Sequence, residues 1–147
     1  MKRNTNLILA AIFFAITGCS TSPTTSDNVT SIPTERALGF QNKSDSSATI
    51  IISRDSGFLS GGGCFVSILI DGKTAARINT SEIGKFYVEP GRHIIGISGD
   101  PLGGGLCKYQ IGQPIKESST EVSKGDVQKF RISGGTNAGL DIRPTSL

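Results

Sequence analysis

The chain has 147 residues, of which 18% are charged and 6% aromatic, and its formal net charge is +3. Without Lys2 and Arg3, which stand in a separate N-terminal segment, 13 basic residues face 12 acidic ones and the net charge falls to +1. The remaining basic residues are scattered among acids, which argues against a nucleic-acid-binding protein with a concentrated basic face. We therefore interpret them as a solvated surface.

The first 18 residues have the pattern of a secretory signal. Lys2 and Arg3 precede an apolar run over residues 7–16, which is shorter than the roughly 20 apolar residues of a transmembrane helix. The alternative is a short membrane anchor that is never cleaved. The run ends in Ile16-Thr17-Gly18-Cys19, which resembles the lipobox of bacterial lipoproteins.

This resemblance implies that residues 1–18 are removed and that Cys19 becomes a lipidated N-terminus. Two or three acyl chains together hold a protein on a membrane effectively permanently, whereas one chain holds it only marginally. Ser20 follows the cysteine, which in Gram-negative lipoproteins implies transfer to the outer membrane, facing the periplasm. The expected partner of the N-terminus is thus a membrane of the bacterial cell envelope.

Residues 19–35 are rich in Ser, Thr and Pro and have almost no bulky apolar side chains. Such a segment buries too little surface to offset the entropy of ordering. We therefore expect residues 19–35 to form a disordered, lipidated tether and residues 36–147 to form one domain.

The domain reads as all-β, because runs of β-branched residues alternate with turn signals and no helical periodicity of useful length follows the signal. Asp71-Gly72 is a two-residue hairpin signal, and Pro90-Gly91 fits a type II turn. About seven or eight short strands favour an antiparallel β-sandwich of the immunoglobulin or transthyretin type. The expected strands cover residues 48–54, 64–71, 74–80, 83–89, 93–98, 120–122, 127–133 and 140–143.

The succession of "IIISRDSGF", "IDGK", "VEPGRHIIGIS" and "VSKGDVQKFRIS" resembles the small domains of an uncharacterised family of bacterial lipoproteins. It is more distantly similar to PEGA-type surface domains, in which hairpins build an immunoglobulin- or transthyretin-like sandwich. The resemblance covers about residues 47–132. It implies a fold and an envelope location, and it implies no catalytic residue.

Two further cysteines each follow a run of three glycines, in "SGGGCF" and "LGGGLCK". Lipidation of Cys19 leaves Cys64 and Cys107 as an even pair in an oxidising compartment, where disulfides persist. We predict that these two cysteines are bonded to each other, with the glycines allowing the two loops to approach closely. Two buried free thiols are the alternative.

A phosphate-binding loop, a metal site and a catalytic site each have weaker support in the sequence. A β-branched run, rather than the helix of a phosphate-binding loop, follows the first glycine run. His93 is the only histidine, and no spacing motif joins it to the cysteines as a metal site or a catalytic pair. Asp55 and Asp100 read as turn residues rather than a hydrolytic carboxylate pair. We predict no catalytic residue, metal or cofactor.

The expected function is that of a non-enzymatic envelope lipoprotein that contacts another envelope protein or stabilises an assembly. The alternative is a module that binds a small ligand or a glycan through the glycine-rich loops. In that case the aromatic side chains beside the loops would line the site: Phe58, Phe65 and Tyr109.

Overall fold

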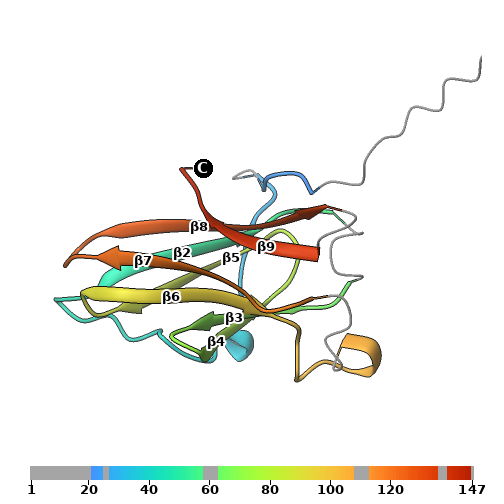
Figure 1. Ribbon diagram of the computed structural model, residues 1–147, viewed down its shortest axis with the longest axis horizontal. Coiled ribbons are helices and arrows are strands. Elements are labelled where there is room, and N and C mark those ends of the chain that lie inside the picture. Colours follow the sequence, from blue (N-terminus) through green and yellow to red (C-terminus); the bar gives the residue numbers. More distant parts are fainter. Residues whose placement is uncertain (1–20, 25–26, 58–62, 108–112, 136–138, 147) are drawn as a thin grey trace, which may run out of the picture.

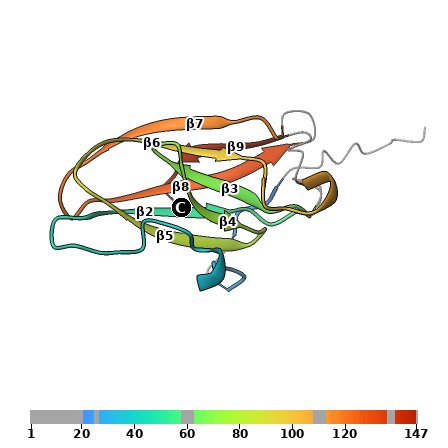
Figure 2. The same cartoon turned by 90° about the horizontal axis from the view of Figure 1, so that it is seen from below.

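The computed structural model of the protein describes residues 21–24, 27–57, 63–107, 113–135 and 139–146. Within these ranges the chain is all-β, with nine strands in two sheets and two single turns of 3-10 helix, η1 (Thr34–Arg36) and η2 (Gly105–Cys107). The two sheets are stacked as the layers of a sandwich (Figure 1, Figure 2). No helix among the described residues is long and apolar enough to cross a bilayer.

Each expected β-run overlaps one observed strand, and β1 is an additional short strand. In spatial order the first sheet contains β1 (Thr30–Ser31), β5 (Glu82–Val88), β2 (Ala48–Arg54), β8 (Val127–Gly135) and β9 (Gly139–Pro144). The second sheet contains β4 (Lys73–Ile78), β3 (Val66–Ile70), β6 (Gly91–Ser98) and β7 (Lys116–Val122).

The expectation of a wholly antiparallel sandwich is wrong for the first sheet. The second sheet is antiparallel throughout, but β2 pairs in parallel with β8, and β1 pairs in parallel with β5. Parallel neighbours require a long crossover between them. The crossover from β2 to β8 consists of the whole second sheet together with β5, so the central parallel pair joins segments that are far apart in the sequence.

The core lies between the layers because alternate residues of each strand point inward. In β2, for example, Ala48, Ile50 and Ile52 are fully buried while the residues between them are half-buried. Each fully buried isoleucine stabilises the fold by roughly 1.5–3 kcal/mol relative to exposure. The core cluster also includes isoleucines and phenylalanines from both sheets: Ile68, Ile70, Ile78, Phe86, Ile95, Ile97, Phe130, Ile132 and Ile142.

One of the two predicted turns joins neighbouring strands of one sheet, and the other joins strands of different sheets. Asp71 and Gly72 have φ values of 50° and 73°, as the predicted hairpin turn between β3 and β4 requires. Gly91 also has a positive φ, of 139°, but the strands on either side of Pro90-Gly91, β5 and β6, belong to different sheets. This turn therefore carries the chain from one layer to the other instead of closing a hairpin.

The N-terminal segment differs from the expected disordered tether where the structure describes it. Thr30 and Ser31 pair with the start of β5, and the amide of Ile32 donates to the carbonyl of Ile83 at 3.0 Å. Ala37 then bridges to Ala76 of β4. Residues 30–41, which we call the strap, thus close the side of the sandwich between β5 and β4. The strap is held by these backbone hydrogen bonds and by Ile32 and Phe40, whose side chains pack against the core. The low apolar content of residues 19–35 does not reveal such contacts.

Candidate functional site at the disulfide end

The predicted bond between Cys64 and Cys107 is confirmed, with their Cα atoms 5.5 Å apart. Cys64 lies just before β3, and Cys107 ends η2 after β6. Gly63 and Gly105 adopt positive φ values of 77° and 55°. A Cβ atom at Gly103 would lie 2.8 Å from the Cβ of Cys107, so a glycine is needed there for the loops to close. Gly61 and Gly62 lie outside the described residues.

Three paired arginines and carboxylates surround the disulfide at this end of the sandwich. In each pair both carboxylate oxygens accept from the guanidinium, the geometry in which arginine binds carboxylates most strongly. The carboxylate side chains are at most 8% exposed. The pairs, with their two distances, are Arg77–Asp100 (2.8 and 2.6 Å), Arg131–Asp55 (2.6 and 2.6 Å) and Arg36–Glu82 (2.7 and 2.5 Å).

The hydrogen bonds in these pairs hold the arginines in their charged form. The bonds to Glu82, Asp100 and Asp55 raise the pKa of Arg36, Arg77 and Arg131 respectively, and outweigh the opposing effect of burial. Asp55 and Asp100, which the sequence places at turns, each pair with their own arginine. Both carboxylates are thus held by guanidinium groups, as structural ion pairs.

Arg54, at the end of β2, is a buried cation that ties the disulfide to β4. Its guanidinium donates to the carbonyl oxygens of Cys64 at 2.9 Å and Ile78 at 3.0 Å. Burial lowers the pKa of Arg54 to about 10, which leaves the group protonated at neutral pH. The interpretation of the basic residues as a solvated surface is wrong for Arg54, which is 1% exposed. A charged residue at a strand end usually points to solvent, so its burial could not be predicted from the sequence.

Phe65 is the one predicted ligand-binding aromatic that the structure describes. The guanidinium groups of Arg36 and Arg77 lie 4.6 and 5.0 Å from the centre of its ring, within the range of cation–π contacts. The ring is therefore engaged by two side chains of its own domain. Phe58 and Tyr109 lie outside the described residues, as does Cys19, so their predicted roles stay predictions.

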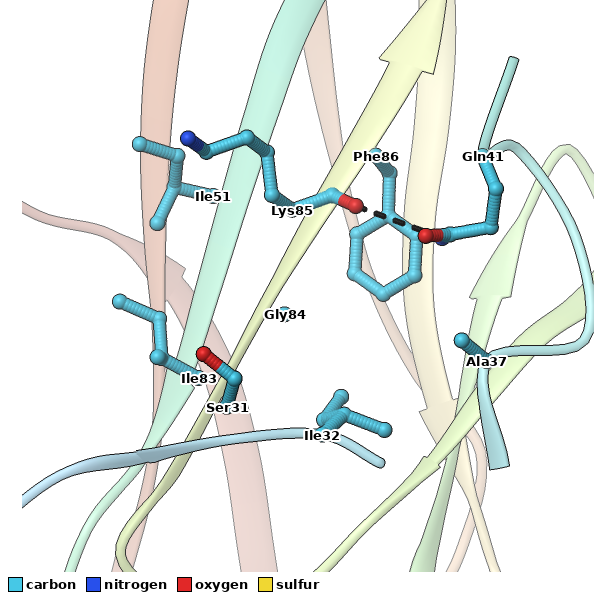
Figure 3. A pocket seen from close by; sticks show the side chains of 9 residues that line it. All are labelled: Ser31, Ile32, Ala37, Gln41, Ile51, Ile83, Gly84, Lys85 and Phe86. Carbon is cyan, nitrogen blue, oxygen red and sulfur yellow. Dashed lines mark hydrogen bonds between the residues drawn. The ribbon is translucent and has the colours of Figure 1, made fainter. Parts of the chain in front are cut away.

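A groove on the side of the sandwich was not predicted from the sequence. It lies between the strap and β5, encloses about 510 Å³ and is lined mostly by apolar side chains (Figure 3). Gly84 forms part of its wall, and a Cβ atom there would lie 2.7 Å from Ile32 and 2.8 Å from the ring of Phe86. The glycine within a β-run was the available signal, because such a residue often marks a close approach.

His93 lies at the opposite end of β6 from the disulfide, so the structure does not bring it to Cys64 and Cys107. Its Nδ1 is 2.7 Å from a carboxylate oxygen of Asp71, and its Nε2 is 2.8 Å from the carbonyl oxygen of Glu89. Both partners can only accept hydrogen bonds, so both contacts are hydrogen bonds only when the ring is the doubly protonated imidazolium. No group of three or more potential metal ligands occurs among the described residues.

The surroundings of His93 predict a pH-dependent stability. Burial lowers the pKa of His93, but its hydrogen bonds to Asp71 and Glu89 outweigh burial and raise it above 6.5. A raised pKa in the folded state stabilises the fold fully below the unfolded value, and this stabilisation is lost as the pH rises through the folded value. We expect the Tm of the wild type to fall relative to that of His93→Gln between about pH 6 and pH 8.

Thermal unfolding of both proteins across this range is the measurement. The pKa of Asp71 responds in the opposite direction, since the hydrogen bonds from the Ile94 amide and His93 overcome burial and lower it from 3.8. Its contribution is therefore lost only as the pH falls below that value, outside the window tested. Parallel Tm curves for the two proteins from pH 6 to pH 8 would show that His93 does not carry the charge.

Comparisons with protein-family models, with curated proteins and with solved structures found no match to this chain. The candidate site therefore rests on its own geometry. That geometry combines a covalent bridge, paired charges and an aromatic ring covered by cations. These contacts join the described residues of β2, β4, β5, β8, the strap and the loop after β6 at one end of the sandwich.

Proposed function

We propose that the protein is a non-enzymatic lipoprotein of the bacterial cell envelope, attached through Cys19 to a membrane, most simply the outer membrane on its periplasmic side. The observation that carries the proposal is the segment Ile16-Thr17-Gly18-Cys19 behind a short apolar run. The disulfide between the other two cysteines supports it, because such bonds persist in exported proteins and are rare in reducing compartments.

For the fold, we propose the transthyretin type of sandwich rather than the immunoglobulin type. In the immunoglobulin order the first two strands are neighbours in one sheet. Here the first two strands of the core, β2 and β3, belong to different sheets, and β2 lies beside β8 in parallel. This order supports the choice between the two types that the sequence left open.

The role that the arrangement supports is contact with another envelope protein, or mechanical support of an assembly. Three arginines at the disulfide end are bonded to carboxylates, and two of these arginines cover Phe65. Groups arranged in this way stabilise a surface instead of offering an unpaired acid, base or nucleophile. A rigid domain close to a membrane is suited to holding a partner in place.

Binding of a small apolar ligand is the second candidate, and the groove beside the strap favours it. Its volume of about 510 Å³ falls in the range of small-molecule sites, although its place differs from the glycine-rich loops first considered. An NMR titration with small apolar compounds tests this role. Shifts confined to Ile32, Ile83 and Phe86 would support it, and unchanged signals from these residues would reject it.

The lipid anchor predicts a clear result for Cys19→Ala. The wild type should incorporate labelled palmitate and partition into the detergent phase, whereas the variant should do neither and should accumulate as a precursor. Cys64→Ser, which keeps Cys19, is the matched control and should still be labelled. Absence of label from the wild type would overturn the proposal, even if the signal were cleaved.

A further inference from the structure

Hydrogen bonds fix the chain to the sandwich from Thr21 onward, two residues after the proposed anchor at Cys19. The amide of Thr21 donates to the carbonyl of Gly134 at 3.1 Å, and its hydroxyl accepts from the Gly134 amide at 3.1 Å. Ser22 and Ser56 exchange two backbone hydrogen bonds of 3.1 and 3.0 Å. These contacts hold the N-terminal segment at the ends of β8 and β2, at the same end of the sandwich as the disulfide.

Only Ser20 separates Cys19 from Thr21. Consecutive Cα atoms advance by at most about 3.6 Å along an extended chain, so the Cα atoms of Cys19 and Thr21 lie within about 7 Å of each other. A lipid on Cys19 therefore brings Gly134 and the disulfide end close to the bilayer surface. A free tether over residues 19–35 would instead let the domain move on the order of 50 Å away.

The surface beside Thr21 has the chemistry of a site for lipid headgroups. A hollow of about 480 Å³ opens there. It is lined by two glycines and by hydroxyl or charged side chains: Thr21, Lys116, Arg131, Ser133, Asp141 and Arg143. Asp55 and Asp141 pair with Arg131 and Arg143. Lys116 forms no ion pair within the described part of the chain, so the hollow keeps a positive excess.

Two large apolar side chains are exposed at this same end. Leu102, in the loop after β6, is 65% exposed, and Ile115, just before β7, is 61% exposed. Figure 1 shows the loop with η2 at the end of the sandwich where residues 21–24 lie. Apolar side chains beside cations suit the boundary between lipid headgroups and acyl chains. There the apolar side chains enter the acyl layer and the cations meet the phosphates.

We propose that the disulfide end faces the bilayer, with anionic phospholipid headgroups seated in the hollow beside Thr21. The inference rests on the proposed anchor at Cys19. It assigns the opposite end of the sandwich, which carries His93 and the Asp71-Gly72 turn, to the side from which a protein partner approaches. The strands then stand away from the membrane rather than along it.

Photo-cross-linking of the full lipidated protein in nanodiscs tests this orientation. A photoreactive amino acid at Ile115 should give lipid adducts in nanodiscs that contain phosphatidylglycerol. The matched control position is Val127, which is 55% exposed but begins β8 at the far end from Gly134, about 23 Å away along the strand. We expect at least tenfold more adduct at position 115 than at position 127.

Charge variants test the headgroup contact. Lys116→Gln should lower the adduct yield at position 115 about fivefold with anionic lipid and leave it unchanged with phosphatidylcholine alone, whereas Lys124→Gln at the far end should leave both unchanged. Equal adducts at positions 115 and 127 in a protein that carries the lipid would overturn the orientation and leave the anchor intact. A protein without the lipid would overturn the anchor itself.

Discussion

Replacing Cys64 and Cys107 together by serine is expected to lower the free energy of unfolding by about 4 kcal/mol. The bond joins residues 43 positions apart, and in the chain-entropy model a loop of this length strongly restricts the unfolded chain. The bridge also holds the loop of Gly103 beside Asp100. Urea unfolding of the oxidised wild type and of the double variant gives the difference directly.

The double variant is preferable to a single one, because a remaining free thiol can form dimers. Reduction of the wild type by a thiol should reproduce the loss, and Cys19→Ser should not, since Cys19 takes no part in the bridge. A double variant within 1 kcal/mol of the wild type would mean that the disulfide end is held by its ion pairs alone.

Asp100→Asn is expected to cost about 3 kcal/mol, the second large effect. The Asp100 side chain is fully buried, and its two oxygens accept from Arg77 at 2.8 and 2.6 Å. Removing one charge of a buried pair leaves the other uncompensated, which typically costs 3–5 kcal/mol. Arg77 is 20% exposed, so water can solvate it in part, and we expect a value at the lower end.

Asp141→Asn is the matched control, because the Arg143–Asp141 pair is exposed at 76% and 37%. Exposed pairs contribute at most about 1 kcal/mol. Equilibrium unfolding of both variants at pH 7 separates the two cases. Equal small losses would show that the Asp100 pair is screened like a surface pair and does not hold the disulfide end.

Local signals explain why most strands could be predicted. The Asp71-Gly72 turn and the β-branched run over 48–54 depend on neighbouring residues only, and the strands there have nearly the expected bounds. The order of strands within the sheets depends on contacts between distant segments. For that reason neither the parallel pairing of β2 with β8 nor the strap was predicted.

The candidate site could likewise be predicted only in part. The cysteine pair could be predicted, because the count of cysteines and the expected compartment leave one pairing. The partners of Phe65 could not, since Arg36 and Arg77 reach its ring from the strap and from β4, and nothing in their sequence spacing indicates it. Asp55 and Arg131 lie 76 positions apart, and only the parallel pairing of β2 with β8 brings them together.

The mass of the N-terminal peptide of the protein purified from its native membrane tests the proposed lipid anchor most directly. We expect a peptide that begins at Cys19 and carries a diacylglyceryl group with or without a further acyl chain, and no peptide from residues 1–18. A mature protein that begins at another residue, or an unmodified Cys19, would contradict it.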